Sequence, residues 1–218
     1  MPIISIHEEV AIKIAQENKK LDTKDFYLGA LAPDTINLHY GFAPKELRWT
    51  AHQRKEDLAN WKESIKYFYQ KEKTNYPRNF ILGYITHILT DIIFDESFYF
   101  DITNKMLNDN ISSTDTHNLM RKDMEYYAAN SKYKNVIKEK LTNQQDFYNI
   151  LNITKEDMRL FTEKNLNTNY EEIPSKYFKE EIIPFLDEID DSARGIGAVN
   201  PVVKTFKAGP FRSLAFFL

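Results

Sequence analysis

Cysteine is absent from this chain of 218 residues. The absence excludes disulfide bonds, thiolate metal ligands and cysteine nucleophiles, and it fits a reducing compartment. Long hydrophobic runs are also missing. No stretch approaches the roughly 20 apolar residues that span a bilayer, and the first residues lack a basic segment followed by an apolar one. We therefore expect a cytoplasmic protein without a signal peptide or a membrane span, with secretion as the alternative.

Glycine is also scarce, and the net charge is small. Only six glycines occur, and three of them lie in residues 192–218, so most of the chain is poor in the turns that all-β folds need. With 29 basic against 32 acidic residues the net charge is −3, which is too weak a field to hold the protein on nucleic acid. We expect helical structure and no stable nucleic-acid partner, while the oligomeric state stays open.

Apolar side chains are present in sufficient number for one core, because hydrophobic residues make up 42% of the chain. They recur at intervals of three and four, which is the helical period. In residues 80–94 they cover nearly every direction around the axis, which predicts a central, buried helix. The sequence therefore predicts an all-α, single-domain, multi-helix bundle. Further helices are expected over residues 5–20, 25–31, 50–74, 117–129, 135–141, 155–164 and 176–188.

Local signals refine these helices. Ser5 with Glu8 forms a capping box for the first helix. Pro33 disfavours helix at Ala32, so Asp34 is expected on a tight corner. Residues 192–218 contain no acidic residue and several basic and phenylalanine residues, so we divide the chain into a helical domain, 1–191, and a tail, 192–218. The tail is either a loosely packed segment or sequence junction, or an appendage that contacts a membrane or a partner.

The pair most informative for chemistry is His87 with Asp91, inside the apolar segment. Residues four apart on a helix point to nearly the same spot. A buried carboxylate needs a compensating partner. One interpretation is a bound cation, and the other is a hydrogen bond from His87 or a neighbouring backbone group to Asp91.

Four stretches extend the pair into a longer pattern. They are the opening Met-Pro-Ile-Ile-Ser-Ile-His, which ends at His7, Phe-Tyr-Leu-Gly-Ala-Leu-Ala-Pro-Asp, which ends at Asp34, Trp-Thr-Ala-His, which ends at His52, and Gly-Tyr-Ile-Thr-His-Ile-Leu-Thr-Asp, which ends at Asp91. Their order over residues 1–130 resembles the bacterial zinc-dependent phospholipase C family, whose helical fold is shared by S1/P1 nucleases.

The resemblance implies a specific set of metal ligands. His52, His87, Asp91 and Asp34 would surround one zinc, and Asp91 would be shared with a second zinc that His7 also binds. It further implies that Asp34 handles the attacking water as a general base. Imidazole and carboxylate are suitable Zn²⁺ ligands, and a carboxylate can bridge two ions.

The family pattern is incomplete at two other places. The secreted relatives bind the second zinc through an N-terminal tryptophan, and here no tryptophan precedes Trp49. A histidine of the third zinc is replaced by Ser97, for which Asp95 could substitute, and His117 could supply another ligand of that ion. One or two zinc ions are therefore expected, and a third depends on Asp95 and His117.

Other catalytic patterns are missing from the sequence, which has no glycine-rich phosphate loop, no Gly-x-Ser-x-Gly and no adjacent His-Asp pair. His39 matches no ligand position and is expected in a loop. The resemblance thus favours a zinc-dependent phosphodiester hydrolase acting on a phospholipid, with peripheral membrane contact through the tail. The alternatives are an S1/P1-like nuclease and a non-catalytic zinc-binding helical protein.

Overall fold

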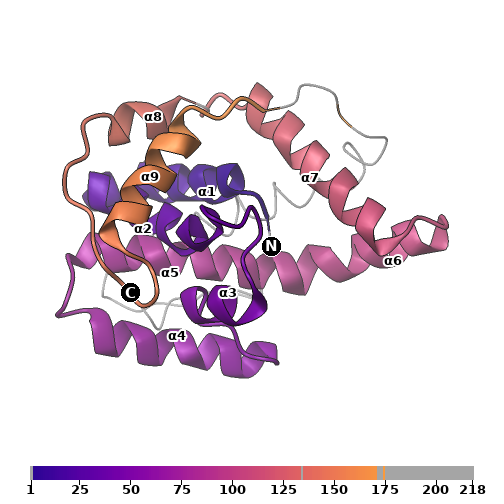
Figure 1. The fold of residues 1–218 in the computed structure, drawn as a ribbon, viewed down its shortest axis with the longest axis horizontal. Coiled ribbons are helices and arrows are strands. Elements are labelled where there is room, and N and C mark those ends of the chain that lie inside the picture. Colours follow the sequence, from indigo (N-terminus) through magenta and orange to yellow (C-terminus); the bar gives the residue numbers. More distant parts are fainter. Residues whose placement is uncertain (1, 134, 171–173, 175–218) are drawn as a thin grey trace.

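The computed structural model describes residues 2–133, 135–170 and 174, and within them the chain is helical (Figure 1). An isolated bridge between Ile150 and Ile153 is the only extended pairing in this described part. The expectation of an all-α bundle is confirmed. The helices are α1 (Ile4–Glu17), α2 (Lys24–Leu31), α3 (Lys45–Ala51), α4 (Leu58–Glu72), α5 (Arg78–Ile93), α6 (Phe100–Asn108), α7 (Ser113–Asn130), α8 (Val136–Leu141) and α9 (Lys155–Leu166), with the 3₁₀ turns η1 (Lys19–Leu21) and η2 (Ala32–Asn37) and the π-helix η3 (Phe94–Tyr99).

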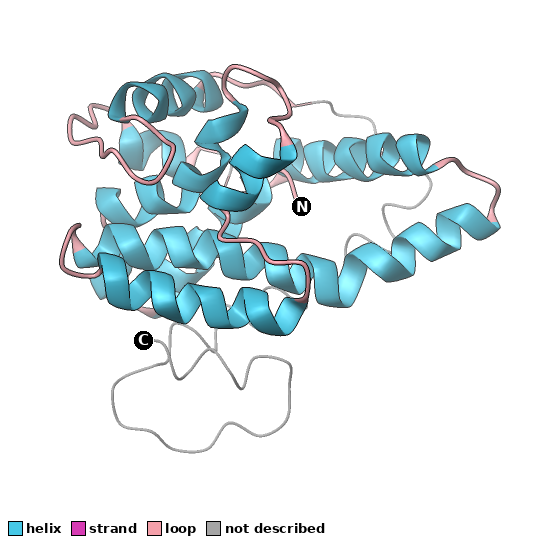
Figure 2. Ribbon diagram, turned by 60° about the horizontal axis from the view of Figure 1, so that its bottom comes forward, coloured by secondary structure: helices cyan, strands magenta, loops and turns pink. Residues whose placement is uncertain are grey.

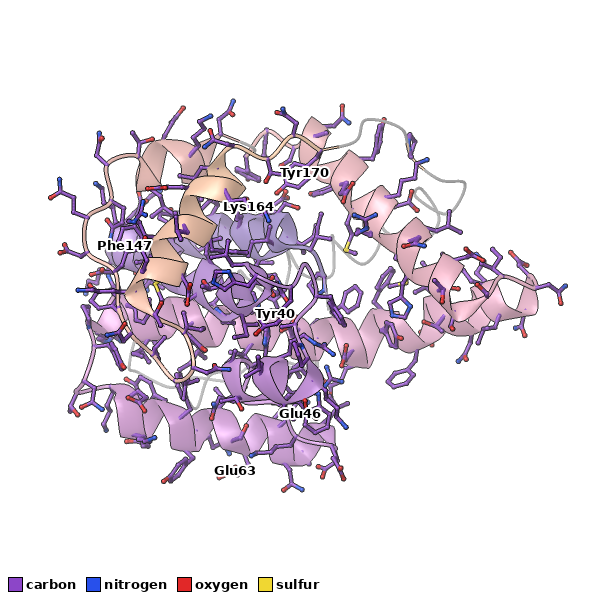
Figure 3. The ribbon with its side chains drawn as sticks, in the orientation of Figure 1. Tyr40, Glu46, Glu63, Phe147, Lys164 and Tyr170 are labelled. Atoms are coloured by element: carbon purple, nitrogen blue, oxygen red, sulfur yellow. The ribbon has the colours of Figure 1, made fainter. Side chains whose placement is uncertain are left out.

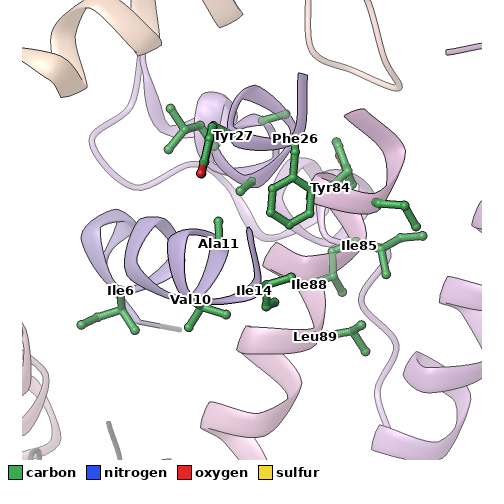
Figure 4. Packing of buried hydrophobic residues seen from close by; sticks show 14 of the residues in the cluster. Ile6, Val10, Ala11, Ile14, Phe26, Tyr27, Tyr84, Ile85, Ile88 and Leu89 are labelled. Atoms are coloured by element: carbon green, nitrogen blue, oxygen red, sulfur yellow. The ribbon is translucent and has the colours of Figure 1, made fainter. Parts of the chain in front are cut away.

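Helix α5 is the centre of the bundle, as its apolar surface predicts. Every residue from Phe80 to Ile93 is buried, because α1, α2 and α4 pack around it. Figure 4 shows Tyr84, Ile85, Ile88 and Leu89 of α5 beside Phe26 of α2, with the apolar side chains of α1 close by. Since α5 carries two of the candidate ligands, this packing also fixes the position of the candidate site.

Two glycines let α2 and α5 touch through their backbones. A Cβ atom added to Gly83 would meet the Phe26 carbonyl and lie 2.9 Å from the Ala30 nitrogen. A Cβ atom on Gly29 would meet the Phe80 carbonyl in the same way. No side chain larger than hydrogen fits at this crossing, so glycine is required at both positions for steric reasons.

The remaining helices cover the core and form one projecting arm. Helix α4 runs along α5, α9 contacts η2, and α8 contacts α1 and α2. Figure 2 shows α5 continuing through η3 into α6, which pairs with α7 as a hairpin that extends away from the bundle. None of the helices in the described ranges is long and apolar enough to cross a membrane.

Several predicted boundaries are wrong at helix starts. Helix α1 begins at Ile4 and is capped by Ile3 without a side-chain hydrogen bond, so the Ser5–Glu8 capping box does not form. The helix expected over residues 50–74 is two helices: α3 ends at Ala51 with His52 as its C-cap, and α4 begins after Asp57, whose side chain caps it. Asp34 lies within η2 rather than on a corner, because a proline is tolerated in the first turn of a helix.

The region after α5 was also mispredicted. Helix continues through η3 and α6, for which no helix was predicted, and α7 begins at Ser113, capped by Ser112, rather than at residue 117. Helices α8 and α9 lie where they were expected. The predicted helix over residues 176–188 and the tail 192–218 lie outside the described residues.

Adding one methyl group at the crossing tests its tightness. Gly83→Ala should lower the free energy of unfolding by about 1–3 kcal/mol, since the Cβ must displace backbone atoms. Helix propensity alone predicts a gain of about 1 kcal/mol for the same change. Urea unfolding measures whether the substitution lowers or raises the free energy of unfolding. The reverse change on an exposed surface, Ala59→Gly in α4, is the control and should cost about 1 kcal/mol. A Gly83→Ala protein as stable as the parent would contradict the close crossing.

Candidate metal centre

Five ligand-type side chains from distant parts of the sequence converge at the centre of the bundle. His7 comes from α1, Asp34 from η2, His52 from the end of α3, and His87 and Asp91 from α5. Four of them are 0–1% exposed, and Asp34 is 7% exposed. The spatial convergence that the sequence pattern predicted is therefore present.

The distances between their polar atoms suit a shared cation. His52 Nε2 lies 3.3 Å from His87 Nε2, 3.5 Å from Asp34 Oδ1 and 3.6 Å from Asp91 Oδ2. His87 Nε2 lies 3.7 Å from Asp91 Oδ2. Two ligands bound tetrahedrally at zinc–ligand distances of 2.0–2.2 Å are about 3.4 Å apart. The side chains of His52, His87, Asp34 and Asp91 thus already have nearly the spacing of a zinc shell.

Backbone carbonyls fix the orientation of two of the imidazoles. His87 Nδ1 donates to the Ala30 carbonyl at 2.8 Å, and His52 Nδ1 donates to the Arg48 carbonyl at 2.9 Å. Each neutral ring then carries its proton on Nδ1, so Nε2 presents a lone pair. Two lone pairs facing each other at 3.3 Å repel unless a cation lies between them. This arrangement of metal ligand and backbone acceptor is typical of metal-binding histidines.

His7 and Asp91 provide the strongest indication that a group is to be bound. Both ring nitrogens of His7 and both carboxylate oxygens of Asp91 are buried and have no hydrogen-bond partner. Buried polar atoms are nearly always satisfied, and an isolated buried carboxylate costs several kcal/mol. A divalent cation would satisfy these atoms at once. The residues present therefore fit a metal ion.

The two oxygens of Asp91 face different histidines. Oδ1 lies 3.5 Å from His7 Nε2, whereas Oδ2 faces His52 and His87. The His7 ring stacks on the His87 ring with centroids 3.6 Å apart and planes 5° apart. Two overlapping groups of three ligands result, namely His7 with Asp34 and His87, and His52 with His87 and Asp91.

Burial sets the protonation states at the cluster. It lowers the pKa of His7 and of His87 well below the ordinary value, with a further contribution from neighbouring imidazoles, so both rings are neutral as metal binding requires. Burial raises the pKa of Asp91 to about 7. For Asp34 and His52, burial opposes ionisation, but their mutual interaction and the other charges of the cluster outweigh it, so the pKa of Asp34 is lowered and that of His52 is raised.

Several residues outside the ligand set hold it in place through hydrogen bonds, and no pattern in the sequence marks them for this role. The Trp61 indole donates to the His52 carbonyl at 2.9 Å, and the Tyr84 hydroxyl donates to the preceding carbonyl of Ala51 at 2.5 Å. Asn37 Nδ2 donates to Asp34 Oδ1 at 3.1 Å. Trp61 lies in the segment over residues 50–74 that was predicted only as a helix. Its role as a donor depends on where α3 ends, and the spacing of apolar residues did not predict that end.

The two residues expected to help bind a third zinc lie elsewhere. The Asp95 carboxylate forms an ion pair with Arg54 Nη2 at 2.6 Å. His117 is exposed, and its ring contacts the Ser113 carbonyl and the Tyr99 hydroxyl. Among the described residues, neither belongs to a group of three ligand-type side chains. The pairing of Asp95 with an arginine and the exposure of His117 on α7 do not support a third zinc at these residues, and their role as ligands stays a prediction. His39 lies in an exposed loop, as expected, and pairs with Asp157.

A helical bundle with imidazoles and carboxylates converging at its buried centre defines a metal-dependent, all-α class of protein. The family model described as zinc-dependent phospholipase C matches residues 6–168, and the chain belongs to this family. The match extends past residue 130, where the recognisable motifs end, and includes α8 and α9. Neither a curated protein nor a solved structure matches the chain.

Zinc analysis of purified variants tests the ligand set. The parent protein should hold about one zinc ion or more per chain, and His87→Ala and Asp91→Ala should lose most of it, because each removes one of the few ligands that the ion needs. His117→Ala and His39→Ala, which change exposed histidines, should keep the parent content. Equal zinc in all five proteins would rule out the cluster as the binding site.

Metal removal should destabilise the fold. A metal present at 1,000 times its Kd adds about 4 kcal/mol to the free energy of unfolding, which for a domain of this size raises the Tm by about 10 °C. Thermal unfolding with and without a chelator measures the difference. In Asp91→Ala the chelator should have little further effect, and a chelator-induced shift as large as that of the parent would place the bound metal elsewhere.

Proposed function

We propose that the protein is a zinc-dependent phospholipase C that hydrolyses a phosphodiester bond of a phospholipid. The observation that carries this proposal is the set of unpartnered, buried ligand atoms of His7 and Asp91 beside the inward-facing Nε2 atoms of His52 and His87. The family to which the chain belongs supports the choice of metal and of substrate class.

The proposed ligands divide between the two oxygens of Asp91. His52, His87 and Asp34 would hold one ion with Oδ2, and His7 lies on the side of Oδ1, where a second ion would bind. When bound, zinc lowers the pKa of water to about 7 and neutralises negative charge on phosphoryl oxygens. The chain contributes a rigid shell, because backbone carbonyls and ring stacking fix the imidazoles before any ion arrives.

Asp34 is the proposed general base. It is the most exposed member of the cluster, so substrate and water reach the cluster from its side. Asn37 Nδ2 donates to Oδ1 at 3.1 Å, which orients the carboxylate. Its lowered pKa keeps it ionised at neutral pH and able to accept a proton from water. No covalent nucleophile is needed, because the attacking group is water.

Parallel assays test the reaction and its rivals. The zinc-loaded protein should hydrolyse a phosphatidylcholine emulsion faster than single-stranded DNA. The opposite preference would favour an S1/P1-like nuclease. Bound zinc without activity on either substrate would overturn the proposal in favour of a non-catalytic zinc-binding protein.

Removing the charge of Asp34 tests its role as a base. Asp34→Asn should lower kcat by about 10²–10⁴-fold, the usual contribution of a general base, while the amide oxygen and the other ligands retain zinc. The matched control is Asp57→Asn, which changes an exposed aspartate to another good helix cap. Unchanged kcat in Asp34→Asn with full zinc content would assign the proton transfer to another group.

A further inference from the structure

The loop over residues 38–44, which joins η2 to α3, exposes two aromatic side chains within three residues. Tyr40 is 55% exposed and Phe42 is 68% exposed. Figure 3 shows Tyr40 on the face of the molecule in front of the bundle centre, above α3 with its exposed Glu46. Single exposed apolar residues are ordinary on protein surfaces. Two neighbouring rings at the tip of one loop form a local apolar surface.

This loop is held in place by the same residue that orients Asp34. Asn37 donates through Nδ2 to Asp34 Oδ1, and its Oδ1 accepts from the Ala43 amide at 3.0 Å. The Asn37 carbonyl also accepts from the amides of Tyr40 and Gly41. Gly41 has a φ of 67°, the left-handed conformation that glycine adopts without strain. The aromatic tip is therefore tied through Asn37 to Asp34, the most exposed member of the cluster.

Cationic side chains accompany the aromatic rings. The Arg48 guanidinium lies 3.9 Å from the centre of the Phe42 ring, and the Lys45 ammonium lies 4.1 Å from the centre of the Trp49 ring. Arg48 is also tied to the loop, because its Nε donates to the Ala43 carbonyl at 2.8 Å. Phospholipid surfaces present phosphate groups above an apolar layer, and this surface presents cations beside aromatic rings.

We propose that Tyr40, Phe42, Lys45 and Trp49 form a docking surface for a phospholipid bilayer. The aromatic rings enter the interfacial layer, where amphipathic and aromatic side chains are favoured, and the cations contact lipid phosphates. This inference deepens the proposed function, because docking would bring lipid phosphates to the entrance beside Asp34.

A bilayer suits this surface better than a protein does. Stable protein interfaces bury about 800 Å² on each partner, which two rings and their neighbours do not provide. Binding to a lipid surface grows with the apolar area that is inserted and with attraction between basic groups and anionic lipids, so a small surface can attach reversibly. This surface belongs to residues 38–49, whereas the membrane contact considered from the sequence was assigned to residues 192–218, which lie outside the described residues.

Co-sedimentation with phosphatidylcholine vesicles, with and without phosphatidylglycerol, tests the surface. Phe42→Ala should lower vesicle binding about tenfold or more, as expected for the loss of one buried aromatic side chain. The control is Tyr67→Ala on α4, where the ring is 71% exposed and should be dispensable. Lys45→Gln should weaken binding chiefly to the vesicles with phosphatidylglycerol. Equal binding by the parent protein and Phe42→Ala would overturn the proposal, as would equal losses in Phe42→Ala and Tyr67→Ala.

Two further measurements distinguish membrane docking from self-association and from the proposed hydrolytic function. Sedimentation of the lipid-free protein detects self-association, and a dimer that Phe42→Ala dissolves would assign the surface to a second copy instead. Hydrolysis of a short-chain, monomeric phosphatidylcholine should be equal in the parent and Phe42→Ala, whereas hydrolysis of vesicles should fall. A holoprotein without hydrolytic activity would refute the proposed function, while the vesicle-binding comparison would still decide the docking surface.

Discussion

The direct backbone contact between α2 and α5 is the constraint on which the candidate metal centre depends. Gly29 and Gly83 remove every side chain from the crossing, so the two helices approach as closely as their backbones allow. One turn beyond Gly83, His87 reaches the Ala30 carbonyl of α2. This hydrogen bond sets the tautomer and direction of the imidazole. The geometry of the metal ligand thus follows from the absence of two Cβ atoms.

The charge balance of the cluster follows from its burial. Because His7 and His87 are neutral, Asp34 and Asp91 are the groups whose two carboxylates would together balance one divalent cation. Without such an ion, Asp91 takes up a proton near neutral pH, which replaces a buried charge by a buried neutral acid. Metal binding therefore releases that proton, and affinity for the metal increases with pH in the range where Asp91 titrates. A second divalent ion would need further negative charge, which a hydroxide ion or an anionic substrate could supply.

The sequence predicted those parts of the protein that depend on local spacing. The apolar surface of α5 and the four-residue spacing of His87 and Asp91 need only the helical period, and both were predicted correctly. His7, Asp34 and His52 were included by resemblance alone, since no local signal shows that three separate segments meet. Whether these residues bind zinc stays a prediction.

Other features could not be predicted, for identifiable physical reasons. The carbonyls of Ala30 and Arg48 are present in any sequence, so only the fold shows that they orient His87 and His52. The break between α3 and α4 leaves the His52 carbonyl free to accept from the Trp61 indole, a contact between residues nine apart that no helical spacing indicates. Asp95 lies one turn beyond Asp91 and has the chemistry of a ligand. Its ion pair with Arg54 requires the chain to turn after α3. The apolar spacing predicted one continuous helix over this turn.

The π-helix η3 determines which side of α6 faces the interior of the projecting arm. A π-turn holds about one residue more than an α-turn, so η3 advances the rotational phase of everything that follows by about 100°, the angle of one residue. Ile102 and Met106 of α6 are fully buried at this phase, and α6 packs against α7. In an unbroken α-helix the same side chains would turn toward another direction. The π-helix η3 therefore sets the direction in which α6 and α7 project from α5, the helix that carries His87 and Asp91.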